Sequence, residues 1–176
     1  MNARVKESLR KCGALTYGDF VLSSGKRSPY YIDIKKASTD PEVLAVIAQE
    51  MSRTLSAEGV GFDRIAGVVL GSIPLAVALS LKTKVPYVMV RKEKKDHGTG
   101  KLVEGTLGKG ERVLVVEDVI TSAGSVADAV TILRNEGAVV ETVLAVVDRQ
   151  EGGRERLEGM SVRLLPLLTA RDLLGA

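Results

Sequence analysis

Apolar residues in this chain fall into short continuous runs that alternate with segments of helical periodicity. Continuous apolar runs of four to seven residues are typical of strands buried on both faces, and such strands belong to parallel sheets covered by helices. The pattern therefore predicts an α/β fold with a mostly parallel central sheet flanked by helices. The predicted strands are residues 65–70, 87–90, 112–116, 141–147 and 162–165, and the helices between them are residues 75–81 and 125–136.

The first forty residues do not follow this alternation. Residues 2–12 predict a short amphipathic helix, and two short strands at 20–22 and 30–33 flank a polar turn. A helix at 41–56 then leads into the alternating part, with Pro41 at its first position. We expect residues 1–40 to form a small hood over the carboxyl ends of the strands, where ligands bind in such sheets. Residues 1–176 together suit a single domain.

Composition and net charge limit the kinds of ligand and the cellular compartment that suit this chain. With a net charge of +3, the chain can bind small polyanions or nucleic acid, so charge alone decides little. Aromatic residues make up only 3%, which argues against stacking on single-stranded nucleic acid. The single cysteine, Cys12, excludes an intrachain disulfide and favours a reducing cytoplasm. The sequence has neither a secretory signal nor an apolar run of roughly 20 residues, so we expect a cytoplasmic protein that binds neither membrane nor nucleic acid.

The most informative segment is the run from Val113 to Ser125. It predicts a buried strand that ends in the adjacent acids Glu117 and Asp118, then a loop of small and hydroxyl residues that opens a helix. Backbone amides at a helix N-terminus favour a phosphate, and carboxylates hold sugar hydroxyls. A simple helix cap would explain the hydroxyls but not two adjacent acids. Neither of the common glycine-rich nucleotide motifs is present.

This run resembles the phosphoribosyl pyrophosphate (PRPP) motif of the type I phosphoribosyltransferases. The resemblance implies their fold, with Glu117 and Asp118 at the ribose hydroxyls and residues 121–125 around the 5-phosphate. It also makes Asp118 a predicted catalytic residue. The PRPP-binding residues that it implies in this segment are Glu117, Asp118, Val119, Ile120, Thr121, Ser122, Ala123, Gly124 and Ser125.

A second segment, residues 91–101, opens a polar connection that runs from 92 to 111 without a predicted helix or strand. In isolation such a charged stretch is typical of a solvated loop. Its sequence is similar to the mobile catalytic loop of the orotate phosphoribosyltransferases, in which basic residues neutralise the pyrophosphate leaving group. The resemblance implies a homodimer whose lid loops reach across subunits, with Lys95 contributing most to the rate. The PRPP ligands that it implies are Arg91, Lys92, Lys95 and His97.

Two further segments resemble the same enzymes and imply the base-binding residues. The hairpin at 20–33 matches their N-terminal signature, which makes Lys26, Tyr30 and Tyr31 the groups that enclose orotate. The run that begins with Asp148 and Arg149 matches a motif whose arginine binds the substrate carboxylate, which a guanidinium fork suits. Thr121 is the expected second contact to orotate.

Residues 67–76 resemble the pyrophosphate loop of the family, with one departure. Bacterial orotate enzymes commonly carry a lysine just before the glycine at position 71, whereas this chain has Leu70. One cationic contact to the pyrophosphate is therefore missing from this loop.

Together the resemblances imply transfer of phosphoribosyl from PRPP to orotate, giving orotidine 5′-monophosphate and pyrophosphate in de novo pyrimidine (UMP) biosynthesis. Mg²⁺ would be the cofactor, held mainly by PRPP and water, with no metal site made by the protein. Two alternatives are a phosphoribosyltransferase for another base and a PRPP-sensing transcriptional regulator. Such regulators generally add a DNA-binding segment, for which the residues before Phe20 leave little room.

Overall fold

A six-stranded sheet forms the centre of the protein, and the computed structural model describes residues 2–21, 27–91 and 101–174. The strand order is β5-β4-β3-β6-β7-β8, and every neighbouring pair is parallel except β4 and β5. This arrangement confirms the predicted α/β class and the mostly parallel sheet. The strands are β3 (Arg64–Val68), β4 (Tyr87–Val90), β5 (Val103–Glu104), β6 (Arg112–Ile120), β7 (Val139–Asp148) and β8 (Arg163–Thr169).

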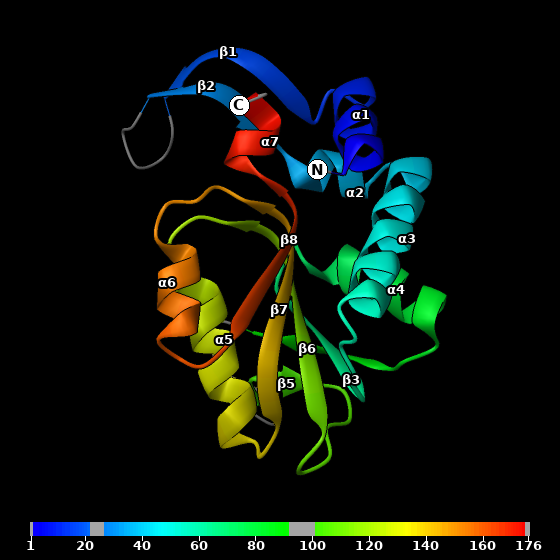
Figure 1. The fold of residues 1–176 in the computed structure, drawn as a ribbon. Helices are drawn as coiled ribbons and strands as arrows, with labels where there is room; N and C mark the ends of the chain where they lie inside the picture. Colours follow the sequence, from blue (N-terminus) through cyan, green and yellow to red (C-terminus); the bar gives the residue numbers. More distant parts are fainter. Residues whose placement is uncertain (1, 22–26, 92–100, 175–176) are drawn as a thin grey trace.

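Helices cover both faces of this sheet (Figure 1). Helices α3 (Pro41–Ala57) and α4 (Ile73–Thr83) lie on one face, and α5 (Gly124–Asn135) and α6 (Gly153–Glu158) lie on the other. Each face has its own cluster of fully buried aliphatic side chains, so β6 and β7 are buried on both sides, as their apolar sequences predict. No helix in the described part of the chain is long and apolar enough to cross a membrane.

The predicted hood is present above the carboxyl ends of the strands (Figure 1). Both ends of the chain build it, because the C-terminal helix packs against the N-terminal elements. The Tyr17 hydroxyl donates a hydrogen bond to the Leu173 carbonyl at 2.6 Å, and the Lys6 ammonium donates to the Asp172 carbonyl. The elements of the hood are α1 (Ala3–Lys11), β1 (Leu15–Val21), β2 (Arg27–Ile32), α2 (Ile34–Ser38) and α7 (Ala170–Leu174).

Several short elements were not expected from the sequence. Helices α2, α6 and α7 have five or six residues each, too few to show a helical period. The two residues of β5 lie within the connection 92–111, which was predicted to be without structure, and they pair with the end of β4. Residues 92–100 of that connection lie outside the described part.

Strand β6 is longer than predicted, and this difference changes the site. The expected strand ended at Val116, whereas β6 continues to Ile120 and stays paired with β7 up to Asp148. Glu117 and Asp118, predicted as the acids at the strand's end, therefore lie within the strand and are followed in it by Val119 and Ile120. Polar residues at 117 and 118 end the apolar run, but backbone pairing with β7 continues past them.

Candidate active site

Two adjoining cavities lie at the carboxyl ends of the strands, beneath the hood. The loop cavity, of about 380 Å³, is lined by residues 117–126, which run from β6 through a loop into α5, by residues 68–71 at the end of β3, and by Lys35. The hood cavity, of about 540 Å³, is lined by residues of the hood, by the end of β6 and by Arg149 after β7. Four residues line both cavities, namely Lys35, Asp118, Val119 and Thr121.

The loop from Thr121 to Gly124 leads directly into α5, and that helix has no side-chain cap. Ala123 holds its backbone in the left-handed region, with φ of 56°, at the N-cap position. The N–H groups of the first turn are therefore left for an anion, in keeping with the predicted phosphate site. All nine predicted PRPP-binding residues of this segment, 117–125, line the loop cavity.

Glycine at position 153 lets α6 support this loop from behind. A Cβ atom at Gly153 would lie 2.4 Å from Cγ2 of Ile120 and 2.6 Å from the carbonyl oxygen of Thr121. The close approach holds the loop against the helix.

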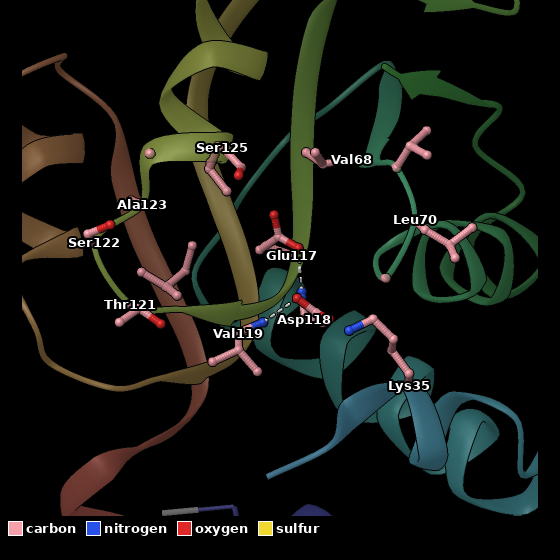
Figure 2. Close-up of a pocket in the computed structure, with 15 residues that line it drawn as sticks. Lys35, Val68, Leu70, Glu117, Asp118, Val119, Thr121, Ser122, Ala123 and Ser125 are labelled. Carbon is pink, nitrogen blue, oxygen red and sulfur yellow. Dashed lines mark hydrogen bonds between the residues drawn. The ribbon is translucent and has the colours of Figure 1, made fainter. Parts of the chain in front are cut away.

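The two adjacent acids occupy different environments (Figure 2). Glu117 is only 7% exposed, and its carboxyl oxygen accepts hydrogen bonds from the Ser72 hydroxyl and from the backbone N–H of Asp118. Burial, with the neighbouring Asp118 adding to it, raises the pKa of Glu117 to about 8. The side chain of Asp118 instead lines both cavities, and its Oδ1 accepts from the Val119 N–H at 2.7 Å. Glu117 thus holds its proton at neutral pH, and Asp118 is the acid shared by both cavities.

The segment after β3 packs tightly against these acids. A Cβ atom at Gly71 would lie 2.3 Å from Oδ2 of Asp118, so only glycine fits there without a shift. Ser72 is fully buried and ties the segment to β6 through Glu117. Nothing in the sequence singles out Gly71 or Ser72 as partners of the acids, because they lie 45 or more residues away along the chain. Leu70, the departure noted above, is 73% exposed at the rim of the loop cavity.

Arg149 is held rigidly at the wall of the hood cavity. Its Nε donates to Oε1 of Glu151 at 2.9 Å, and an Nη contacts the Ser28 hydroxyl at 3.5 Å. The guanidinium carbon lies 4.9 Å from the centroid of the Tyr30 ring, a cation–π arrangement. The fork is thus oriented before any ligand binds.

Of the residues predicted to bind orotate, Tyr31, Thr121 and Arg149 line the hood cavity together. Tyr30 is buried beneath Arg149 and is absent from the cavity lining, so its ring supports Arg149 and does not face the cavity. Burial raises the pKa of its phenol, which stays protonated at neutral pH. Lys26 lies outside the described residues.

Comparison with known proteins places this geometry in a family. Residues 38–164 match the model of the phosphoribosyl transferase domain. An orotate phosphoribosyltransferase of Methanosarcina acetivorans is 51% identical over 95% of this chain and 88% of its own length. The chain belongs to the orotate phosphoribosyltransferase family.

Solved structures of the family have the same fold. A crystal structure of orotate phosphoribosyltransferase from Aeropyrum pernix has a TM-score of 0.87 and 39% identity, covering 97% of this chain and 96% of the other. The enzyme of Mycobacterium tuberculosis in complex with PRPP has a TM-score of 0.80 and 30% identity, covering 98% of each chain. The type I phosphoribosyltransferase fold implied by the motifs is therefore confirmed.

Of the connection 92–111 that the family resemblance implies as a lid, residues 92–100 lie outside the described part, whereas 101–111 are described and include β5. Arg91 follows β4, where its backbone N–H donates to the Leu102 carbonyl at 2.8 Å and its Nη1 lies 3.6 Å from Oε1 of Glu104. Arg91 lines neither cavity within the described part of the chain. Its role as a PRPP ligand stays a prediction. The other three predicted ligands, Lys92, Lys95 and His97, lie outside the described residues.

The oxygen ligands that this site offers suit a metal ion that binds together with a phosphorylated substrate. Within the described ranges there is no cluster of three or more histidine, cysteine or acidic side chains that could hold a metal ion. Glu117 is protonated and turned toward Ser72, which leaves Asp118 as the acid that both cavities share. A Mg²⁺ ion here would take most of its oxygen ligands from phosphates, sugar hydroxyls and water.

Proposed function

We propose that this protein transfers the phosphoribosyl group of PRPP to orotate, giving orotidine 5′-monophosphate and pyrophosphate in de novo pyrimidine biosynthesis. The observation that carries the proposal is the junction of two cavities at Asp118 and Thr121, with a phosphate-type loop in one and a pre-oriented arginine in the other. That arrangement suits two anionic substrates that must meet end to end.

The residues that line each cavity support the following binding roles. The loop 121–125 and the N-terminus of α5 hold the 5-phosphate, and Asp118 holds the ribose hydroxyls. Protonated Glu117 fixes Asp118 and the segment at Ser72 from below. Arg149 binds the orotate carboxylate as a fork, while Thr121 and Tyr31 flank the ring.

In the reaction the bond between ribose C1 and the pyrophosphate oxygen breaks with its electron pair staying on pyrophosphate, the orotate ring nitrogen bonds to C1, and the proton of that N–H passes to the departing pyrophosphate or to water. Positive charge develops on the ribosyl group and negative charge on the departing pyrophosphate, so electrostatic placement supplies the catalysis. The Asp118 carboxylate faces the developing positive charge. Arg91, Lys92, Lys95 and His97 are proposed to neutralise the pyrophosphate, with Lys95 acting most strongly. No covalent nucleophile is required.

Mg²⁺ accompanies PRPP and supplies charge neutralisation at its phosphates and hydroxyls. We propose that the connection 92–111, outside the residues of β5 that pair with β4, carries a lid that closes over the site of a second copy, in a cytoplasmic homodimer. The whole chain forms one domain, with residues 1–40 supplying most of the hood.

The test is loss of orotate absorbance in the presence of PRPP and Mg²⁺. We expect turnover by the wild type, a rate lower by roughly a hundredfold or more for Lys95→Ala, and no change for Lys82→Ala, an exposed lysine on α4. If Lys95→Ala turns over orotate at the wild-type rate, the assignment of Lys95 and the lid is wrong, but the proposed enzymatic activity stands. No consumption of orotate, alongside consumption of another base, would overturn the proposed substrate.

A further inference from the structure

The loop cavity is poor in positive charge for a site that would hold a polyanion. Two acids, Glu117 and Asp118, line it, and most of the remaining wall is backbone, small residues and hydroxyls. Among the described residues that line it, Lys35 is the only basic one. PRPP carries a 5-phosphate and a pyrophosphate, and the helix N-terminus serves only the first of these.

The fold fixes where Lys35 lies. It is the second residue of α2, which begins after Asp33 and packs Ile34 and Ala37 into the core, 2% and 0% exposed. Burial of those two residues turns Lys35 toward the cavities, and it lines both of them. In Figure 2 its ammonium points toward Asp118, on the side of the cavity where Leu70 lies. The loop 121–125 lies at the other end of the view.

We propose that Lys35 binds the pyrophosphate of PRPP and stabilises the charge that builds on it as it leaves. The inference rests on the proposed function and adds a residue from the hood to the pyrophosphate site. Lys35 lies near Asp118 and the 68–71 segment, so it is placed at the pyrophosphate end of the sugar and not at the 5-phosphate end. The exposed aliphatic side chain of Leu70 supplies no charge to this end.

Lys36 provides a matched control on the same helix. Its ammonium donates to the Gly13 carbonyl at 3.3 Å, and it lines neither cavity. Removing either lysine changes the net charge by the same amount, so a general loss of attraction for anions would affect both variants equally.

The experiment measures binding of Mg-pyrophosphate and of ribose 5-phosphate by calorimetry, and kcat/KM for PRPP, in Lys35→Met and Lys36→Met. We expect Lys35→Met to weaken pyrophosphate binding and lower kcat/KM by about ten- to a hundredfold, the worth of one charge-assisted hydrogen bond. Binding of ribose 5-phosphate should stay unchanged. Lys36→Met should behave as the wild type in all three measurements.

A second variant separates charge from folding. Leu70 is exposed at the rim of the same cavity, so a lysine there reaches the same space. The double variant Lys35→Met with Leu70→Lys should regain most of the pyrophosphate binding.

The proposal would be overturned if Lys35→Met weakened the binding of both ligands equally, weakened only the binding of ribose 5-phosphate, or left pyrophosphate binding unchanged. Lack of rescue by Leu70→Lys would overturn it as well. The calorimetry needs no orotate, so it stays decisive for Lys35 even if orotate is not the base that the wild type consumes.

Discussion

The two cavities share Asp118 and Thr121 but are built in different ways. A single continuous segment, residues 117–126, supplies most of the loop cavity, whereas the hood cavity combines hood residues, the end of β6 and Arg149. Their charged groups also differ. Arg149 is paired with Glu151 and stacked on Tyr30, while the buried carboxyl of Glu117 is bonded to a hydroxyl and a backbone N–H.

The same site therefore accommodates buried ionisable groups in two ways. In the hood cavity a permanent cation is stabilised by an ion pair and a ring face. In the loop cavity an acid is kept neutral by desolvation, so the protein carries a protonated carboxyl at neutral pH. The free energy of unfolding should therefore vary with pH because of Glu117 in the loop cavity, whereas Arg149 should add no such dependence.

The largest expected effect is on the free energy of unfolding as a function of pH. The pKa of Glu117 is about 8 in the folded state and 4.5 ordinarily, so the folded state holds a proton that the unfolded state releases. The stability that this group contributes is complete below pH 4.5 and is lost as pH rises through about 8. Glu117→Gln keeps the neutral shape and should remove this loss, which is on the order of a few kcal/mol at up to about 1.4 kcal/mol per pH unit.

Urea unfolding of wild type and Glu117→Gln between pH 5 and pH 8.5 measures the effect. Glu111→Gln is the control, because a hydrogen bond from Arg64 lowers the pKa of Glu111, which is then ionised in both states over that range. The control should keep the wild-type slope. Parallel slopes for wild type and Glu117→Gln would show that Glu117 is ionised in the folded protein.

The next effect is on orotate binding. Arg149→Ala should raise the KM for orotate by about a hundredfold, because it removes a fork already oriented by Glu151 and Tyr30. Arg149→Lys keeps the charge without the fork and should recover only part of the loss. Arg163→Ala is the control, because Arg163 on β8 forms an exposed pair with Glu58 at the end of α3. Initial rates at varied orotate and saturating PRPP provide the measurement, and an unchanged KM would place the carboxylate elsewhere.

Residues that are contiguous in the sequence could be predicted, whereas partners that only the fold brings together could not. The loop cavity lies in one contiguous motif, so residues 117–125 were all assigned from the sequence, and all line the cavity. Ser72 and Gly71 were missed as partners of the acids because only the parallel pairing of β3 with β6 brings them together.

Lys35 was missed for a related reason, because a five-residue helix shows no period and gives no sign of which way its side chains point. The class of fold followed from the apolar runs. The true end of β6 did not, because its last pairs with β7 are backbone contacts that polar side chains do not reveal.

The smallest expected effect tests the close approach of backbone to acid in the loop cavity. Gly71→Ala places a Cβ atom 2.3 Å from Oδ2 of Asp118, so the carboxylate or the 68–71 segment must move. We expect kcat/KM for PRPP to fall by roughly tenfold, with the KM for orotate less affected. Gly159→Ala is the matched control, since its Cβ atom would meet nothing closer than 3.4 Å.

Kinetics at varied PRPP, with the melting temperature measured beside them, separate a local shift from a loss of fold. A normal melting temperature with reduced kcat/KM for PRPP means that the position of Asp118 sets activity, because the rest of the loop cavity is intact. If Gly71→Ala and Gly159→Ala have the same kinetics, the segment yields without moving the acid. In that case the placement of the backbone at Gly71 would not determine the activity of the loop cavity, and the contrast with the hood cavity, whose binding depends on the charge of Arg149, would be wrong there.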